Sequence, residues 1–457
     1  MNYLVFVKAV KGDLSPFDEA ALEVALRLRE KSGGKVTVVT MAPETALDRM
    51  RALTRLGVDE SILLSDKAFA GSDTAATSYI LSLAAKKIPF DLILCGRQSM
   101  DGDTAQVGVS LAARLGINCL TNVMREPVIA DGRLTAETRL GTESATLPAL
   151  LTIERIAKLR FPPMRAKPGT VETLDAKALG ADKKQCGLAG SPTRVIRSFE
   201  SERGKRHCEF LSKNELFAKI DELRALPPEH ENIKKSNFTK LPEVFAVGPD
   251  VAKIASEIAG NVITLERLEP DEYLKIIFKK KPSVVLFPSD LWGRRTAPYV
   301  ATKLETGLCA DCTLLETDGE RLFMYRPAFG GNITAKIVCD RNPQMATVRI
   351  LSESSEIIVS AGLGVKNDLE RVKKLALSLG ADLGASRGLV DAGLAPYEWQ
   401  VGLTGKTVAP KIYLALGISG AIHHTSGFTG SRFILGINPD KNAPVFDWCD
   451  YGCIDVF

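Results

Sequence analysis

Four short loops near the end of the chain are rich in glycine, serine, threonine and amide side chains. They read ASRGLVDAG from Ala385, QVGLTGKTVAP from Gln400, GISGAIHH from Gly417 and GINPD from Gly436. Small residues let a ligand approach the backbone closely, so that backbone N–H groups can bind a phosphate. One such loop usually forms only a turn, but four within residues 385–440 favour a nucleotide-binding edge.

Several side chains in these loops suit the parts of a nucleotide. Ser386 and Arg387 offer a hydroxyl group and a planar guanidinium, which both bind phosphate oxygens. Ser419, at the expected start of a helix, suits the same anion. Asn438 and Asp440 could hold an adenosine.

The pair His423-His424 ends the third loop. Neighbouring residues point in different directions, so the pair is a poor metal chelate, and such a histidine is more often structural. Beside the Gly-rich loops, however, His424 is a candidate hydrogen-bond or charge partner for a redox ring, because an imidazolium stabilises a developing anion.

A second region, CGRQSMDGDTAQVG, starts at Cys95 at the end of a strand and enters a helix, with Asp103 and Thr104 as cap candidates. It is either a capped turn or a second nucleotide site in which the backbone amides of residues 105–107 bind a phosphate. The run AGSDT from Ala70 could close this site from the neighbouring strand.

Other kinds of chemistry find little support. Cys309 and Cys312 have CxxC spacing, but no second CxxC accompanies them, so we expect no metal site. No Ser/His/Asp arrangement, HExxH motif or P-loop lysine motif is visible. The sequence therefore indicates neither hydrolysis nor phosphoryl transfer, and we predict no catalytic residue.

Residues 154–167, ERIAKLRFPPMRAK, carry five basic side chains against the single acid Glu154. The two adjacent prolines forbid a continuous helix. The run is therefore an exposed basic loop with an apolar tip at Phe161 and Met164. It is either a solvated connector or a docking element.

The elements that must position these residues follow an α/β pattern. In the first 150 residues β-branched runs alternate with helical periodicity, which predicts a parallel, doubly wound sheet with a hairpin appended over 124–152. Ligands of such sheets bind outside the carboxyl ends of the strands, here after Val7 and after Cys95. The predicted strands are 3–7, 35–40, 60–64 and 91–95, and the predicted helices are 15–31, 43–56, 73–87 and 104–115.

Residues 170–240 show little strand pattern but one amphipathic helix at 212–226, followed by a polar, proline-flanked linker. Two further α/β blocks follow. Their predicted strands include 244–247, 262–265, 283–287, 321–325, 411–416 and 433–437, and their predicted helices are 250–258, 270–280, 295–305 and 368–379.

Length and composition set the frame. At roughly 150 residues per domain, 457 residues suggest about three domains. Lys+Arg 59 against Asp+Glu 55 leaves a net charge of +4, which excludes a dedicated nucleic-acid binder. Nine cysteines are too few for a disulfide scaffold and the start carries no cleavable signal, so we expect a cytoplasmic protein. The apolar stretches are shorter than the ~20 residues that span a bilayer, so we expect no membrane insertion.

These motifs, in this order, resemble the electron transfer flavoproteins. The four loops and the run DKNAPVFDWCDYG look like the FAD-binding domain of the family's α subunit. RRTAPYVATKLETGLCADCTLL, RPAFGGNI and ATVRI look like the α-subunit domain that precedes it. DEAALEVALRLRE, FAGSDTAAT and CGRQSMDGDTAQVG resemble the β subunit. The resemblance covers nearly the whole chain and implies that β-like and α-like parts are fused, with the β-like part first.

The implied fold class is α/β, with two Rossmann-like parallel-sheet domains that resemble adenine nucleotide hydrolases and a C-terminal FAD-binding α/β domain. We expect a β-subunit-like domain at 1–226, with a recognition loop at 155–166 and a C-terminal arm. A linker at 227–240, a truncated α-subunit-like domain at 241–350 and an FAD-binding domain at 351–457 would follow.

The resemblance implies that FAD accepts electrons from a flavin dehydrogenase of the acyl-CoA dehydrogenase type and delivers them to another oxidoreductase. The recognition loop would dock the dehydrogenase through Arg160, Phe161 and Met164. In the FAD site, Thr404 would lie near the flavin and His424 near its pyrimidine carbonyl. The implied FAD-binding residues are Ser386, Arg387, Gln400, Val401, Gly402, Thr404, Gly405, Ser419, Gly420, Ala421, His424, Asn438 and Asp440.

The β-like site would hold AMP, as in ordinary members, or a second FAD that takes hydride from NADH, as in electron-bifurcating members. The run GRQSMDGDTAQVG favours the bifurcating type, whereas the short stretch between Val10 and Phe17 argues against it. A non-redox adenine-nucleotide-binding protein is the alternative of another class. The residues expected at this second site are Ala9, Cys95, Asp103, Thr104, Ala105, Gln106 and Val107.

Two positions depart from the family pattern. Leu363 stands where members usually place an arginine over the flavin, and Leu403 stands where they usually have glutamine. Losing a cation near the ring removes stabilisation of an anionic flavin, on the order of 1 to a few kcal/mol. We therefore predict a midpoint potential below the family norm.

Overall fold

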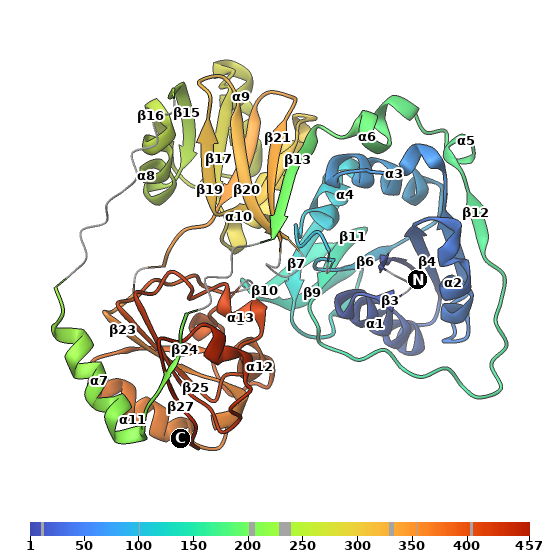
Figure 1. Cartoon of the computed structure of the whole chain (residues 1–457). Helices are drawn as coiled ribbons and strands as arrows, with labels where there is room; N and C mark the ends of the chain where they lie inside the picture. Colours follow the sequence, from blue (N-terminus) through green and yellow to red (C-terminus); the bar gives the residue numbers. More distant parts are fainter. Residues whose placement is uncertain are drawn as a thin grey trace. The chain divides into compact units, whose positions relative to one another are not determined.

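The computed structural model describes residues 1–10, 13–99, 101–200, 206–227, 239–328, 333–352, 354–402 and 405–457. The chain divides into two compact units, and each unit is built on parallel β-sheet (Figure 1). Unit 1 comprises Met1–Ser198, Phe238–Phe329 and Ala335–Val348, and unit 2 comprises Phe199–Asn237, Gly330–Thr334 and Arg349–Phe457. The predicted α/β class is confirmed.

The largest sheet of unit 1 has the strand order β10-β9-β7-β11-β6-β1-β4-β5-β12, with β8 beside β9. Strand β1 (Asn2–Phe6) pairs in parallel with β4 (Lys35–Met41) on one side and with β6 (Leu92–Gly96) on the other. The chain passes from β1 through β4 to β5 (Glu60–Leu64) and then returns to β6. The topological switch point therefore lies between β1 and β6, where ligands of doubly wound sheets bind.

Helices cover both faces of this sheet. Tyr3 and Val5 of β1 share a buried core with α1 and α2, whereas Leu4 and Phe6 share another with α3 and α4. A strand that is buried on both faces reads as a continuous apolar run, as this one does. The four helices are α1 (Pro16–Ser32), α2 (Leu47–Thr54), α3 (Thr74–Lys87) and α4 (Val107–Leu115).

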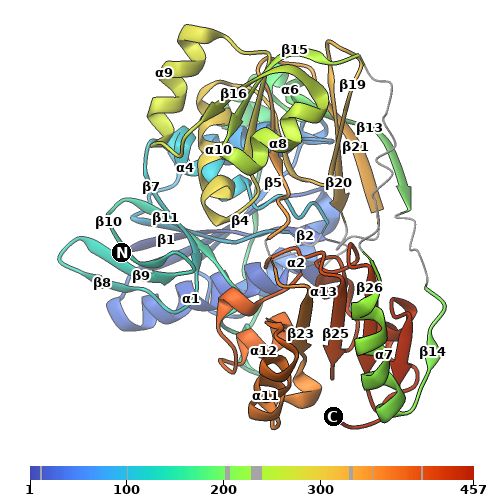
Figure 2. The ribbon, with the colours of Figure 1, turned by 90° about the vertical axis from the view of Figure 1, so that its left-hand side faces the viewer.

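The predicted hairpin is present and projects from one end of the sheet (Figure 2). Strands β8 (Val128–Ala130) and β9 (Arg133–Thr138) pair antiparallel across Asp131 and Gly132, which have φ of 50° and 71°. Strand β10 (Gly141–Thr146) continues the antiparallel pairing on the other edge of β9. The neighbouring parallel strands are β7 (Asn118–Val123) and β11 (Ala149–Ile153).

Unit 1 contains a second parallel sheet with the order β16-β15-β17-β22-β18, and a four-stranded sheet has the order β13-β21-β20-β19. The strands of the parallel sheet are β15 (Leu241–Val247), β16 (Ala259–Leu265), β17 (Val284–Pro288), β18 (Leu308–Cys312) and β22 (Gln344–Val348). Its helices are α8 (Pro249–Ile258), α9 (Pro270–Lys280) and α10 (Leu291–Lys303). The remaining strands are β13 (Thr193–Glu200), β19 (Leu314–Thr317), β20 (Leu322–Ala328) and β21 (Ile333–Cys339).

Residues 170–240 contain more strand than the sequence pattern predicted. Besides β13, this segment holds β12 (Glu172–Leu174) and β14 (Glu209–Phe210). The prediction was wrong because β13 is exposed along almost its whole length, so no alternation of apolar and polar residues marks it.

The sheet of unit 2 is entirely parallel, with the order β14-β27-β26-β25-β23-β24. Helix α7 (Lys213–Ala225) buries Leu216, Ile220 and Leu223 in the core of this unit. The packing therefore groups the arm before residue 227 with the C-terminal block. The other elements are β23 (Ile357–Ala361), α11 (Leu369–Leu379), β24 (Asp382–Ala385), α12 (Arg387–Asp391), β25 (Ile412–Leu416), α13 (Ile422–Thr425), β26 (Phe433–Ile437) and β27 (Tyr451–Cys453).

Candidate functional site

The Gly-rich loops of unit 2 meet along one edge of its sheet. Because the strands are parallel, the loops that follow β23, β24, β25 and β26 all leave from the carboxyl edge. Backbone hydrogen bonds join neighbouring loops to neighbouring strands. These bonds run from Gly362 N to Leu416 O (2.8 Å), from Ser386 N to Ala361 O (2.8 Å) and from Gly417 N to Ile437 O (2.9 Å). The predicted nucleotide-binding loops are thus brought together.

Backbone segments approach each other closely at this edge. A Cβ atom added at Gly362 would lie 2.1 Å from the carbonyl oxygen of Gly417, and one at Gly364 would lie 2.9 Å from the Cα atom of Gly417. Gly417 itself has φ of +58°. Glycine is required here because any side chain would force the loops apart.

The run from Gln400 lies beside β24. Val401 N donates to Ala385 O at 3.0 Å, and Lys406 N donates to the carbonyl oxygen of Gln400 at 2.8 Å. Gln400 is buried, and a Cβ atom at Gly405 would lie 2.1 Å from its carbonyl oxygen. The predicted flavin neighbour Thr404, like Leu403, lies outside the described residues.

His424 is buried, with both ring nitrogens engaged. Nδ1 lies 2.9 Å from Val401 O, and Nε2 lies 3.1 Å from the hydroxyl oxygen of Tyr413. Burial lowers the pKa of His424 to about 4. The ring is therefore neutral at pH 7, donating from Nδ1 and accepting at Nε2. Of the two roles that we considered for His424, this favours the hydrogen-bond partner over the charged one, because a cation at this depth would lose its hydration.

The residues predicted to bind phosphates take different places along the edge. Ser386 precedes α12, and Arg387 Nε donates to Asp391 Oδ2 at 3.0 Å. Ser419 is exposed, but it does not open a helix as expected, because α13 begins at Ile422. The intervening Gly420 has φ of +87°, which a helix start would not allow.

The side chain of Asn438 shapes the loop after β26. Its Nδ2 donates to Ile418 O at 2.9 Å, and its Oδ1 accepts from Asp440 N at 2.9 Å. Asp440 in turn accepts from Asn442 N at 2.9 Å. The exposed Asp440 lies beside Asn438 at this edge, and their contacts to an adenosine stay a prediction.

In unit 1, Asp18 joins the ends of β1 and β6 at the switch point. The sequence interpretation missed this side chain. Asp18, in the first turn of α1, is 6% exposed. Its Oδ2 accepts from Lys8 N after β1 and its Oδ1 accepts from Gly96 N at the end of β6, both at 3.0 Å. Burial raises the pKa of Asp18 to about 7. The only sequence signal was its position after Pro16, which reads as an ordinary helix start.

The loop after β6 is held in an unusual backbone conformation. Asp103 and Ala105 have φ of 50° and 55°, the left-handed region that non-glycine residues rarely adopt. Gln98 Nε2 donates to Asp103 Oδ1 at 3.0 Å, and Ser15 Oγ donates to Gln98 O at 3.3 Å. The predicted cap role of Asp103 and Thr104 is wrong, because the left-handed residues delay the start of α4 to Val107.

The other residues predicted at this second site lie around the switch point but differ in exposure. Ala9 follows β1 and is partly exposed, whereas Cys95 is buried beneath α4, with Sγ 3.0 Å from where a Cβ at Gly108 would lie. Gln106 bridges two other segments of unit 1. Its Oε1 accepts from Thr74 Oγ1 at 2.9 Å, and its Nε2 donates to Leu308 O at 3.3 Å.

A buried charge cluster links the same loop to the start of the basic loop. Arg97 Nε and Arg139 Nε lie 3.4 Å and 2.7 Å from Glu154 Oε1, with all three side chains almost fully buried. The Arg97 guanidinium also stacks over Phe17 at 5.2 Å from the ring centroid. The sequence interpretation missed this cluster, because its members are distant along the chain.

Two family models match this chain. Residues 3–179 and 265–355 match the electron transfer flavoprotein domain, and residues 352–429 match the electron transfer flavoprotein FAD-binding domain. This chain belongs to the electron transfer flavoprotein family. The family carries electrons, so this assignment replaces the non-redox alternative.

Both subunits of other electron transfer flavoproteins are similar to parts of this chain. It is 41% identical over 225 residues to the α subunit from Thermoanaerobacterium thermosaccharolyticum, covering 39% of this chain and 68% of that subunit. It is 42% identical over 199 residues to the β subunit from the same organism, covering 41% of this chain and 76% of that subunit. It is also 34% identical over 294 residues to the acryloyl-CoA reductase electron transfer subunit beta of Anaerotignum propionicum. This match covers 45% of this chain and 80% of that subunit.

The donors at the carboxyl edge of unit 2 suit FAD, the cofactor of this electron transfer flavoprotein domain. Hydroxyl and guanidinium groups serve phosphates, and the glycine-lined loops leave the backbone accessible. In the part of the chain that the structure describes, no group of three or more His, Cys, Asp or Glu side chains could hold a metal ion. Within the same residues, no helix is long and apolar enough to cross a membrane.

Proposed function

We propose that this electron transfer flavoprotein takes electrons from a flavin dehydrogenase of the acyl-CoA dehydrogenase type and passes them to another oxidoreductase. The observation that carries the proposal is the convergence of four predicted FAD-binding loops on one edge of a parallel sheet. FAD, when bound, supplies a ring that accepts and releases electrons. The kinship with an acryloyl-CoA reductase electron transfer subunit supports an acyl-CoA-linked donor.

In this proposal the residues of unit 2 bind and orient FAD. Ser386, Arg387 and Ser419 hold its phosphates, and Asn438 with Asp440 holds its adenosine. The turn 400–405 borders the flavin, with Thr404 near the reactive part of the ring. Buried His424 contributes a neutral ring at the pyrimidine side and fixes the turn through its bond to Val401 O.

We further propose that the switch point of unit 1 binds a second adenine nucleotide. Asp18 bonds to both strand exits, and Asp103 and Ala105 in the loop after β6 have left-handed backbone conformations. Strain of this kind is typical of ligand sites. AMP would make the site structural, whereas a second FAD that reacts with NADH would make the protein electron-bifurcating.

The proposed domain assignment is β-like for 1–226 and α-like for 241–457, with 227–240 as the linker and 351–457 as the FAD-binding part. The grouping of residues 199–237 with unit 2 supports a β-like arm that packs on the FAD-binding part.

Anaerobic reduction tests the proposal. The purified protein is mixed with an acyl-CoA dehydrogenase and its acyl-CoA substrate, and the visible flavin absorbance is followed. We expect bleaching that depends on both additions. Bleaching by NADH alone, with two FAD released per chain, would assign the bifurcating form. A colourless protein would contradict the proposal.

A further inference from the structure

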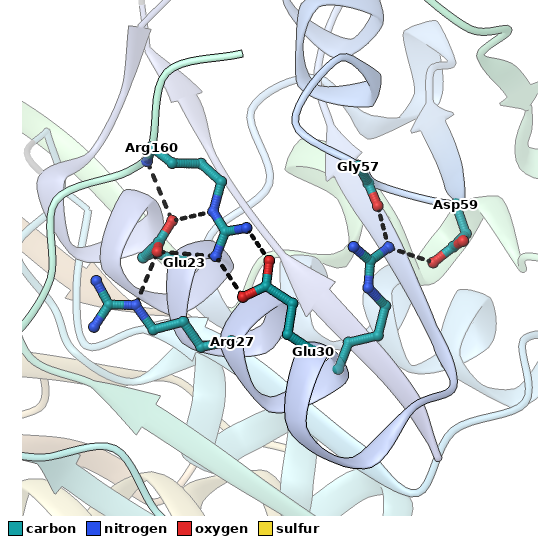
Figure 3. Close-up of polar contacts among 7 residues, drawn as sticks. Glu23, Arg27, Glu30, Gly57, Asp59 and Arg160 are labelled. Carbon is teal, nitrogen blue, oxygen red and sulfur yellow. Dashed lines mark hydrogen bonds and ion pairs between the residues drawn. The ribbon is translucent and has the colours of Figure 1, made fainter. Parts of the chain in front are cut away.

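The guanidinium of Arg160, in the basic loop, is engaged within unit 1 (Figure 3). Its Nε and its backbone N–H donate to Glu23 Oε2 at 3.0 Å and 3.1 Å, and its Nη2 donates to Glu23 Oε1 at 3.1 Å. Nη2 and Nη1 also bond to the two carboxylate oxygens of Glu30. Both acids lie on α1, so Arg160 ties the loop to that helix.

The inner partner of this contact is a buried carboxylate. The side chain of Glu23 is 4% exposed, and Arg27 Nε donates to it at 2.8 Å. Burial alone would raise the pKa of Glu23, but the hydrogen bonds from Arg160 and Arg27 lower this pKa below its usual value. A planar guanidinium that meets two carboxylates in this way fixes direction as well as distance.

The rest of the loop is fixed on both sides of a short tip. Ile156 and Leu159 pack against the core that contains α1. Beyond the tip, Arg55 Nε donates to Ala166 O at 3.0 Å and Gly169 N donates to Thr54 Oγ1 at 2.7 Å. The loop is therefore anchored on α1 and on the end of α2.

Only residues 161–165 stand away from these anchors. Phe161 is 94% exposed and Met164 is 99% exposed. The two prolines between them restrict the backbone, and Ala166 N donates to Pro163 O at 3.0 Å, which closes the tip. Exposed cations flank the tip along the chain, at Arg155, Lys158, Arg165 and Lys167.

We infer that Arg160 is a positioning residue, which holds the tip 161–165 in one pose before a partner binds. The occupant that fits the tip is a partner protein with an apolar pocket rimmed by carboxylates, because two exposed apolar side chains are flanked along the chain by exposed cations. Fixing the loop in advance lowers the entropy lost on docking. The choice of partner rests on the proposed function. The clamp, meaning the bonds from Arg160 to Glu23 and Glu30, rests on contacts within unit 1 alone.

Hydrogen exchange followed by mass spectrometry tests the clamp without any partner. Arg160→Met removes the charge but keeps an unbranched stem, and Glu30→Gln weakens the clamp from the half-exposed helix side. We expect exchange of the loop amides to quicken about tenfold in Arg160→Met and less in Glu30→Gln. Arg165→Met, which removes a cation outside the clamp, should leave loop exchange unchanged. Wild-type exchange in Arg160→Met would overturn the inference.

Kinetics with an acyl-CoA dehydrogenase and its acyl-CoA substrate test the consequence. Arg160→Met should raise the KM for this protein about threefold to tenfold with kcat unchanged, and Arg160→Lys should restore part of the loss. Arg165→Met should raise KM without faster exchange. An unchanged KM in Arg160→Met, despite faster exchange, would overturn the positioning role. If wild type is not reduced at all, the proposed function fails, and the exchange result still decides whether the clamp exists.

Discussion

The two candidate nucleotide sites both lie at the carboxyl edge of a parallel sheet, yet they are held in different ways. In unit 2 the loops touch backbone to backbone, and glycine at positions such as 362 and 417 makes this possible. In unit 1 the switch point is held by side chains, above all Asp18 between Lys8 N and Gly96 N. The site of unit 2 should therefore lose its nucleotide when a side chain is added. The site of unit 1 should lose its nucleotide when a side chain is removed.

Adding a side chain in unit 2 should have the largest effect. In Gly362→Val, the new Cβ would lie 2.1 Å from the carbonyl oxygen of Gly417. We expect nearly complete loss of bound FAD, measured as flavin per protein after purification. Gly380→Ala is the matched control, because its left-handed φ of +62° adds strain but nothing lies within 4 Å. It should lower stability by roughly 1–2 kcal/mol and keep FAD. A wild-type content of FAD in Gly362→Val would show that the close backbone contact at residue 362 is not needed for FAD binding.

Removing a side chain in unit 1 should empty the second site only. Asp18→Ala leaves the partly buried Lys8 N and Gly96 N without their acceptor, and an unsatisfied donor costs up to about 1–3 kcal/mol when it is fully buried. We expect the second adenine nucleotide to fall at least about tenfold while FAD is retained. Glu19→Gln, a carboxyl change in the same helical turn, serves as the control. Loss of FAD in Asp18→Ala, with the second nucleotide retained, would contradict the separation.

The two sites should also respond to pH with opposite signs. Asp18 has a raised pKa of about 7 against 3.8, so the folded protein binds the extra proton and stability falls as pH rises between these values. His424 has a lowered pKa of about 4 against 6.5, so stability falls as pH drops through that range.

Urea unfolding of variants at several pH values measures both slopes. The difference from wild type should change by up to about 1.4 kcal/mol per pH unit, in opposite directions for Asp18→Asn and His424→Gln. Slopes of the same sign would show that the pKa of one of the two side chains is shifted in the opposite direction.

The smallest expected effect concerns the flavin potential. Leu363 is half-exposed, and a Cβ at Gly388 would lie 2.9 Å from its Cδ1, so it lies at the first turn of α12. Leu363→Arg should raise the midpoint potential by tens of millivolts, where about 1.4 kcal/mol equals roughly 59 mV for one electron. Leu377→Arg, on the exposed side of α11, adds the same charge and should change nothing. Equal midpoint potentials in wild type, Leu363→Arg and Leu377→Arg would show that a charge at residue 363 does not affect the flavin.

The difference between the sites also explains how much could be predicted from sequence. The site of unit 2 depends on local glycine patterns, so its loops were found and the structure brings them together. The site of unit 1 depends on contacts between Asp18 and residues far along the chain, which leave no local pattern. Buried strands such as β5 were predicted to the residue, because a short continuous run of buried, mainly apolar residues marks a strand that is covered on both faces. Strand β13 was missed because it is exposed along almost its whole length, so that no apolar run marks it.

Acid release of the bound cofactors, quantified per chain by chromatography, tests whether the chain binds one nucleotide in each unit. We expect one FAD from unit 2 together with one further adenine nucleotide, either AMP or a second FAD, and Asp18→Ala should lose only this further nucleotide. A protein that releases no flavin, or only a single nucleotide per chain, would show that the two units do not each hold a nucleotide.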